Sequence, residues 1–315
     1  MYKGGNIMLG IYKTEEGRIV RTDKFEEDTW INLVNPTAEE INQVINSINI
    51  EAEFIYAALD EEETSHIDSE DGSTLVIVDI PYPDAKEHGV VQYCTIPLGV
   101  IMTNKHIVTV CLKENDIITD FTSGKVKSVY TNLKTRFLLQ IMYKMATRYL
   151  QDLKQIDKMS NMVERELHVS MRNKELIQLL DLEKSLVFFS TSLKADESTL
   201  EKIMRGRVIK MYEEDKDLIE DVLIEIKQAI EMSNIYSNIL SGTMDAFASI
   251  ISNNLNIVMK VLTSITILMA IPQIFASLYG MNVDTLPIPN FWFVIAISAV
   301  VALVVGIILN KKRLF

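Results

Sequence analysis

Two long apolar segments near the C-terminal end constrain this chain more than any other feature. The first covers residues 261–279 and the second covers residues 291–309, so each is about 19 residues long. A helix needs about 20 apolar residues to cross the hydrocarbon core of a bilayer, because it rises only about 1.5 Å per residue. We therefore predict a membrane hairpin of two helices, joined by a short loop that begins with a polar turn at Gly280.

Charges at the ends of these segments predict their orientation. The basic residues 311–313 follow the second segment and Lys260 precedes the first, whereas the loop 280–290 contains no lysine or arginine. Basic residues mark the cytoplasmic side of membrane helices, so we expect both termini inside the cell and the loop outside. Residues 1–17 lack the apolar core of a secretory signal. We expect a multi-pass protein of the cell (inner or plasma) membrane.

The remaining composition limits the classes of function. The formal charge of −12 repels nucleic acid and can concentrate cations, although for net charge alone ordinary solubility is the favoured explanation. Cys94 and Cys111 lie in apolar, strand-like runs without CxxC spacing, which predicts small buried thiols in a reducing compartment. The four histidines are scattered at no ligand spacing. Without a nucleophile constellation or a GxxxxGK[ST] loop, we expect neither an enzyme nor ATP-driven transport.

Residues 1–124 are predicted to form a cytoplasmic α/β domain with a small, mixed sheet. A helix should follow Thr37, which can cap it while Glu40 completes a capping box. A second helix is expected over residues 51–59. The strands that we expect, from β-branched runs between turn signals, are residues 74–80 (ending at Pro81), 90–102 and 106–112.

Residues 125–254 are predicted to form a stalk of long helices. Apolar residues recur there at intervals of three and four, which is the helical period. We expect breaks at residues 160–171 and near residues 204–206. The last helix should run over residues 213–279, which is roughly 100 Å and needs partners along its length, so we infer an oligomer. A bundle of many short antiparallel helices is the alternative.

The fold class is therefore an α+β membrane protein, with an N-terminal cytoplasmic α/β domain and a long helical stalk continuous with the first of two C-terminal transmembrane helices. The boundaries that we predict for the membrane part are 255–279 for the first transmembrane helix, 280–290 for the extracellular loop, 291–310 for the second helix and 311–315 for a basic cytoplasmic tail.

A stripe of polar, small or flexible side chains runs along the first membrane segment. We define the polar stripe as Asn256, Met259, Thr263, Thr266, Ala270, Gln273 and Ser277, which are spaced by three or four. Polar groups are costly in hydrocarbon and usually face protein or water. The stripe therefore predicts a water-lined path between several copies, and hydrogen bonding between helices is the alternative. Pro272 removes a bond to Leu268 and predicts a kink.

The chemistry of the stripe and the following turn indicates a hard cation. Neither includes a cysteine, a histidine or a carboxylate, which soft or borderline metals stripped of water would favour. Neutral amide and backbone oxygens suit a cation that keeps its water, and Mg²⁺ releases water reluctantly. A ring of Asn282 amides could therefore recognise hydrated Mg²⁺ through hydrogen bonds.

These residues resemble the CorA-type family of magnesium transporters. The family signature Tyr-Gly-Met-Asn, which follows the first of two C-terminal spans, is present as residues 279–282. Residues 256–263 resemble the family's Asn-x-Val-Met-Lys-Val-Leu-Thr, and residues 241–245 also fit. The resemblance is strong over about residues 235–282, moderate to the C-terminus and architectural before that.

The resemblance implies a homopentamer in a lipid membrane that carries divalent cations passively. It assigns the extracellular selectivity filter to Gly280, Met281 and Asn282. It makes Asn256 a polar ring at the cytoplasmic end of the pore, with Met259 and either Leu262 or Thr263 near a hydrophobic constriction. It also implies closure when Mg²⁺ binds acids between neighbouring cytoplasmic domains. Asp84 and Asp221 are our candidates for that regulatory pair, and two solvated surface acids are the alternative.

Two departures from the family pattern leave parts of the predicted pore without assigned residues. A methionine typical of the family's gate falls at Ala270 here, with Met269 adjacent, so the gate is not assigned. The external loop has one acid, Asp284, which we expect to carry the outer cation attraction alone. The function that we expect is channel-like Mg²⁺ transport gated by cytoplasmic Mg²⁺. The alternatives are transport of Co²⁺, Ni²⁺ or Zn²⁺ by the same architecture, and a non-conducting membrane-anchored sensor or scaffold.

Overall fold

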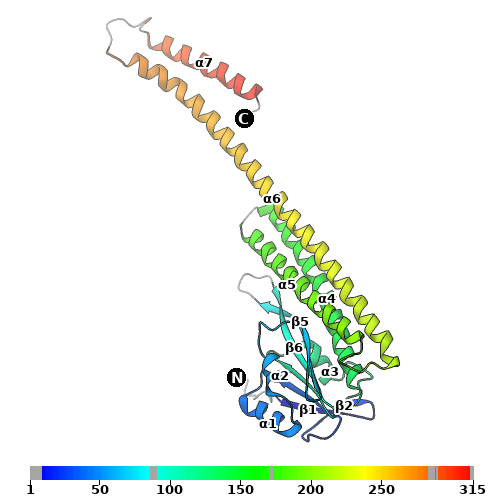
Figure 1. Ribbon diagram of the computed structural model, residues 1–315. Coiled ribbons are helices and arrows are strands. Elements are labelled where there is room, and N and C mark those ends of the chain that lie inside the picture. The colour runs from blue at the N-terminus through cyan, green and yellow to red at the C-terminus, as the bar shows by residue number, and fades with distance from the viewer. Residues whose placement is uncertain (1–8, 86–90, 171–172, 283–287, 289, 313–315) are drawn as a thin grey trace. The chain divides into compact units, whose positions relative to one another are not determined.

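The computed structural model describes residues 9–85, 91–170, 173–282, 288 and 290–312 (Figure 1). The chain divides into two compact units, Met1–Ser241 and Gly242–Phe315. The first unit contains a β-sheet with helices on both faces, and the second contains the end of one long helix and a final apolar helix. The first unit includes helices that follow residue 124. The predicted boundaries of the α/β domain and the stalk, at residues 124 and 254, stay a prediction.

The sheet of the first unit has seven strands in the order β2-β1-β3-β7-β6-β5-β4. The strands are β1 Leu9–Glu15, β2 Arg18–Thr22, β3 Trp30–Val34, β4 His66–Glu70, β5 Ser73–Ala85, β6 Val91–Met102 and β7 Ile107–Cys111. Only β3 and β7 pair in parallel, and the other neighbours are antiparallel. The mixed sheet is confirmed, and it has four strands that the sequence did not reveal.

Two tight turns explain how the outer strands of the sheet fold back. Glu16 and Gly17 between β1 and β2, and Asp71 and Gly72 between β4 and β5, all have positive φ. A two-residue hairpin with both central residues in this region matches the right-handed twist of the flanking strands. Asp-Gly between two apolar runs is a strong turn signal, whereas Glu-Gly is a weaker one.

The strand that we expected to end at Pro81 instead continues through Pro83 as β5. β4 pairs only with residues 73–77, so the later part of β5 has an open side. On that side the Asp79 N–H donates to Asp196 Oδ1 at 2.9 Å. The two prolines follow with the same alternation and have no N–H that needs a partner, which is why an edge tolerates them. The prolines therefore do not end β5, although no further strand pairs along this edge in the described residues.

The helices are α1 Ala38–Ile48, α2 Ala52–Ala57, α3 Asp116–Thr122, α4 Lys134–Ser170, α5 Asn173–Met204, the short 3₁₀ helix η1 Glu213–Asp215, α6 Lys216–Tyr279 and α7 Phe291–Lys311. The capping box at the start of α1 is confirmed. The Glu40 N–H donates to Thr37 Oγ1 at 3.3 Å, and the Thr37 N–H donates to the Glu40 carboxylate at 2.8 Å.

The predicted breaks in the helical region have different outcomes. The break expected at residues 160–171 is wrong over residues 160–170, because α4 continues there with Val163 and Leu167 buried. The break near residues 204–206 is confirmed, since α5 ends at Met204. With 37, 32 and 64 residues, α4, α5 and α6 exclude the alternative of many short helices.

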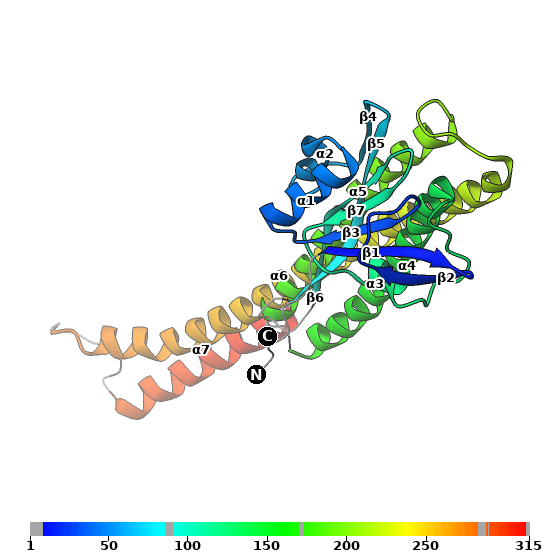
Figure 2. The same ribbon diagram turned by 90° about the horizontal axis from the view of Figure 1, so that it is seen from below.

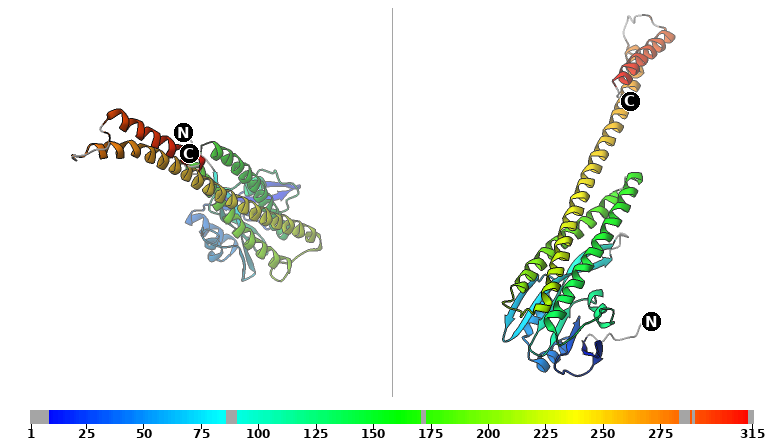
Figure 3. Two further views of the ribbon diagram at one scale, coloured as in Figure 1. Left: turned by 90° about the horizontal axis from the view of Figure 1, so that it is seen from above. Right: turned by 90° about the vertical axis from the view of Figure 1, so that its right-hand side faces the viewer.

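Helices cover both faces of the sheet. On one face α1 and α2 bury a core with alternate strand residues such as Ile31, Leu33 and Ile77. Figure 2 shows α1 and α2 on the other side of the strands from α4. On that second face α4 and α5 lie side by side against β5 and β6 (Figure 3). A hydrogen bond connects the first part of α6 to α5, because Ser233 Oγ donates to the Leu186 carbonyl at 2.8 Å.

Candidate ion path

The second compact unit is a hairpin formed by the end of α6 and by α7, which lies alongside it (Figure 1). Both helices are long and apolar enough to cross a membrane, with mean hydropathies of 1.9 and 2.9 in their most apolar windows. α6 stays helical through Gly242 and Pro272. The length and composition of the two predicted membrane helices are therefore confirmed, whereas a kink at the proline stays a prediction.

One side of α6 packs against α7. We call this the contact seam; its less exposed positions on α6 are Val261, Ser264, Leu268, Ile271, Phe275 and Tyr279, and those on α7 are Val294, Ser298, Val301, Val305 and Leu309. A Cβ added at Gly306 would lie 3.7 Å from Leu268 Cδ2, so the glycine lies close to α6. Ser298, the polar residue in the middle of α7, is buried in this seam and donates to the Ile295 carbonyl at 2.9 Å.

The polar stripe lies on the face of α6 that points away from α7. At about 100° per residue, its mean direction is roughly 160° from that of the contact seam. All its residues are exposed except Ala270, which is half-exposed. α7 therefore covers the apolar side of α6 and leaves the polar side open.

Two threonines of the stripe keep their acceptor oxygens available. Thr263 Oγ1 donates to the Met259 carbonyl and Thr266 Oγ1 donates to the Leu262 carbonyl, both at 2.8 Å. Such bonds satisfy a hydroxyl donor within its own helix. The oxygen lone pairs can then accept hydrogen bonds from water on the open face.

The Gly-Met-Asn motif follows the last residue of α6. The Gly280 N–H donates to the Ala276 carbonyl at 3.0 Å. A Cβ at Gly280 would lie 3.1 Å from that oxygen, so only glycine fits here without a shift. Met281 and Asn282 are exposed. The structure thus places the motif directly after the helix that carries the stripe, whereas Asp284 lies outside the described residues.

The two candidate regulatory acids are exposed and lie on different elements. Asp84 is on β5, opposite Gln92, and Asp221 is near the start of α6. Within the described residues no hydrogen bond joins them, and no group of three or more histidine, cysteine or acidic side chains could hold a metal. One chain by itself does not assemble a regulatory site from this pair, and their role stays a prediction.

The two cysteines are free thiols, as expected from their strand contexts. Cys111 is buried and Cys94 is half-buried. Burial is the main reason why the pKa of each thiol is raised above its usual value. A raised pKa leaves little thiolate at neutral pH, so neither is a reactive nucleophile or a good metal ligand.

A second set of polar side chains, which the sequence reasoning missed, lies on the face of α5 that packs on the sheet. We define the α5 polar row as Ser185, Ser192, Asp196 and Thr199, all of them buried. Each has a partner on or beside the sheet. Ser185 Oγ accepts the Tyr93 N–H at 3.0 Å, Ser192 Oγ donates to Thr95 Oγ1 at 2.9 Å, Asp196 Oδ1 accepts the Asp79 N–H at 2.9 Å, and Thr199 Oγ1 accepts the Ser65 hydroxyl at 2.9 Å.

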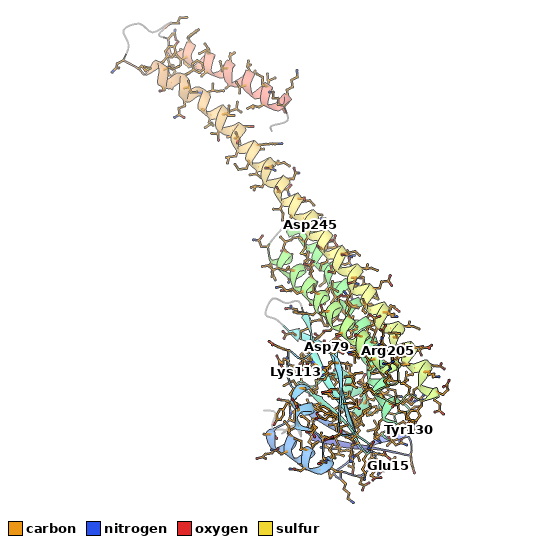
Figure 4. All side chains as sticks on the ribbon, in the orientation of Figure 1. Glu15, Asp79, Lys113, Tyr130, Arg205 and Asp245 are labelled. Carbon is orange, nitrogen blue, oxygen red and sulfur yellow. The ribbon has the colours of Figure 1, made fainter. Side chains whose placement is uncertain are left out.

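The carboxyl groups at this contact are difficult to ionise. Burial raises the pKa of Asp196 well above its usual value, and the neighbouring Asp79 raises it further. Burial also raises the pKa of Asp79, which the polar Ser192 side chain beside it partly opposes. On α4, burial raises the pKa of Asp152 to about 6, although Arg148 Nε lies 3.1 Å from its carboxylate. Figure 4 labels Asp79 within the strands of this unit. The sequence signal for the contact between α5 and the sheet is Asp79, an aspartate inside an otherwise apolar strand.

Comparisons with known proteins agree with this architecture. The family model described as CorA-like Mg2+ transporter protein matches residues 26–313. A curated relative from Methanocaldococcus jannaschii, named Cobalt/magnesium transport protein CorA, is 26% identical over 291 residues that cover 90% of each chain.

Solved structures of other proteins share the fold. The complete structure of the CorA magnesium transporter from Methanocaldococcus jannaschii has a TM-score of 0.82 at 23% identity, and covers 98% of this chain and 99% of the other. The structure of the full-length CmaX protein has a TM-score of 0.70 at 16% identity, and covers 99% of this chain and 100% of the other. The common fold is a soluble α/β part, a long helix and two apolar helices at the C-terminal end.

Proposed function

We propose, on the premise that the chain belongs to the CorA-like Mg2+ transporter family, that it conducts Mg²⁺ passively across a membrane. The family consists of transporters, for which two apolar helices supply the membrane part. The observation that carries the proposal is the open polar face of α6, which runs opposite the contact seam and leads to Gly280 and Asn282. Because a polar face is costly in lipid, it needs water or further copies of α6.

Several copies of α6 around an axis would enclose a water-lined path with the polar stripe inside. The resemblance to the family implies five copies, and we propose a homopentamer. α7 would then lie outside α6 and face lipid, for which its nearly uniform apolar surface is suited. The basic residues after α7 would keep both termini in the cytoplasm, and the loop with Asp284 would lie outside.

The filter that we propose is a ring of Asn282 amides and Gly280 carbonyls that bind Mg²⁺ through its water shell. Mg²⁺ gives up water reluctantly and is often held through it. The stripe and residues 280–282 offer amide, hydroxyl and carbonyl oxygens and two thioethers, but no thiolate, imidazole or carboxylate. Co²⁺ is the second candidate, because the name of the Methanocaldococcus jannaschii relative includes cobalt.

Gating would take place at the cytoplasmic half of the path. A constriction between Met259 and Ala270 would close by losing its water, as hydrophobic gates do. Mg²⁺ bound between Asp84 of one copy and Asp221 of a neighbour would favour the closed state. Exposure of both carboxylates supports this arrangement, because each can reach a partner from another copy.

The filter can be tested by Mg²⁺ flux into liposomes with an Asn282→Ala variant. We expect the flux to fall at least about tenfold, which corresponds to about 1.4 kcal/mol of lost ion stabilisation. Asn310→Ala is the matched control, because this asparagine is exposed at the other end of α7 and lies outside the stripe. Adding Co²⁺ in competition measures whether the same path prefers Mg²⁺.

Two results would contradict the proposal in different ways. Unchanged flux and selectivity in the Asn282 variant would remove the filter from residues 280–282 but leave the path intact. No flux through the wild-type protein, together with normal assembly in detergent, would instead favour a membrane-anchored sensor or scaffold.

A further inference from the structure

A polar cleft of about 750 Å³ lies over one face of the sheet in the first compact unit. It adjoins the carboxyl ends of the two parallel strands, β3 and β7, and is closed on one side by α3. Ligands of open α/β sheets commonly bind beyond the carboxyl ends of the strands. The volume is also within the range of about 300 to 1,000 Å³ that small-molecule sites occupy.

An aromatic ring packs closely on a strand in this cleft. A Cβ at Gly10 would come within 2.7 Å of Tyr12 Cε2 and 2.8 Å of its hydroxyl oxygen, so the Tyr12 ring rests on the backbone of β1. The centre of the Tyr12 ring is 4.9 Å from that of Trp30. Tyr82 of β5 also lines the cleft. Fixed aromatic rings of this kind offer a flat surface to a planar ligand group.

A chain of hydrogen bonds orients an amide group in the cleft. Trp30 Nε1 donates to Thr109 Oγ1 at 2.8 Å, and an indole nitrogen can only donate. The Thr109 hydroxyl must then give its own hydrogen to Asn32 Oδ1, which is 2.9 Å away. This fixes the oxygen of Asn32 toward Thr109. The Asn32 NH₂ group has no acceptor within the part of the chain that the structure describes, and it lines the cleft.

Two cations line the same cleft as that amide. Arg21 is exposed on β2, opposite Tyr12 in the register, and forms no ion pair among the described residues. Lys113 follows β7 and is labelled in Figure 4; its Nζ is 5.1 Å from the centre of the Tyr82 ring and 3.8 Å from a Glu61 carboxylate oxygen.

The balance of charge in the cleft favours an anion. The one acid that lines it, Glu114, is exposed, in a chain whose net charge is −12. Two cationic side chains and an amide donor without an acceptor suit the oxygens of a phosphate, because an arginine fork can bind two of them at once.

We propose that this cleft binds a nucleoside polyphosphate, with its phosphates against Arg21, Lys113 and the Asn32 amide, and its base against Tyr12 or Tyr82. Cations and aromatic rings at one site match the two parts of such a ligand, and neither part alone uses the whole lining. The site belongs to the first compact unit and does not depend on the ion path.

The test is titration calorimetry of the full chain in detergent with ATP, in EDTA so that divalent ions do not contribute. We expect Arg21→Ala and Asn32→Asp each to weaken ATP binding at least about tenfold. Asn32→Asp keeps the acceptor for Thr109 and replaces the NH₂ donor with a negative oxygen. The matched control is Arg18→Ala, which removes the same charge from β2 but on the opposite face of the strand.

Tripolyphosphate and adenosine separate the two parts of the ligand, and both should bind more weakly than ATP. Adenosine that binds as tightly as ATP would overturn recognition of the anion, and tripolyphosphate that does so would overturn the contact with the base. Absence of ATP binding to the wild-type protein, or equal binding to the Arg21, Asn32 and Arg18 variants, would overturn the proposal as a whole.

Discussion

The α5 polar row and the polar stripe of α6 are similar in sequence but lie in different surroundings. Both are rows at helical spacing on long helices, and small polar side chains recur in each. The α5 polar row is buried, and each of its members has a hydrogen-bond partner on or beside the sheet. The polar stripe is exposed on the face that α7 does not cover.

This difference concerns which groups form hydrogen bonds with a polar helix face. A polar group without a partner costs about 1 to 3 kcal/mol when it is buried, so either face must be satisfied by protein or water. α5 finds its partners within the same chain, and the row fixes α5 to the sheet. On the open side of α6 the stripe residues Thr263 and Thr266 donate only to carbonyls of their own helix, and we propose that water or other copies of the chain satisfy the rest of that face.

The largest effect should follow from removing the polar groups of α6. A variant with Thr263→Val, Thr266→Val and Gln273→Leu keeps the side-chain sizes similar but makes the open face apolar. We expect Mg²⁺ flux into liposomes to fall more than about tenfold, because a path lined by apolar groups loses its water.

The control for this variant changes as many residues on the neighbouring helix. Val300, Val304 and Ile307 are exposed on α7, and replacing all three with leucine should leave the flux within about twofold. Equal losses in the two variants would mean that the stripe is not distinct from the lipid-facing surface, and the comparison with α5 would then fail.

The next effect concerns the α5 polar row. Asp196→Ala removes the acceptor of the buried Asp79 N–H, so we expect the free energy of unfolding to fall by about 1 to 3 kcal/mol. Urea unfolding of the full chain in detergent measures this. Glu197→Ala is the control, because that residue makes only a 3.8 Å contact with Lys227 and such pairs contribute about 0 to 1 kcal/mol. A loss no larger than in the control would show that the row is not structural.

Much of the fold could be predicted because its signals are local. The apolar runs fixed α7 and the end of α6, and Thr37 with Glu40 marked the start of α1. The membrane part of the candidate site was predictable for the same reason, since the polar stripe and residues 279–282 lie on one continuous helix or directly after it.

The rest depends on which elements become neighbours, which local patterns do not contain. Pro81 ends a strand only if another strand needs its N–H, and β4 stops before it. The α5 polar row and the α6 stripe both follow the helical period, and the packing of α5 on the sheet shows that only the former is buried. The cleft brings Arg21, Asn32 and Lys113 together from β2, β3 and the segment after β7, so no single segment could reveal it.

The smallest effect that we expect is on the pH dependence of stability, and it tests whether the buried acid of the α5 polar row is protonated. The pKa of Asp196 is raised in the folded chain, by burial and by Asp79 on β5, and Tyr149 of α4 also faces it. The folded state therefore keeps a proton that the unfolded state releases above its ordinary value of about 3.9. Where the unfolded state binds fewer protons, stability falls as the pH rises.

Asp196→Asn should reduce this fall, because the amide oxygen still accepts the Asp79 N–H and no longer titrates. Unfolding free energies measured from pH 5 to pH 8 should show a flatter slope for this variant, with equal or greater stability than the wild type at pH 8. Glu197→Gln, on the neighbouring position of α5, should keep the wild-type slope. An unchanged slope in the Asp196 variant would mean that this carboxyl is ionised in the folded chain.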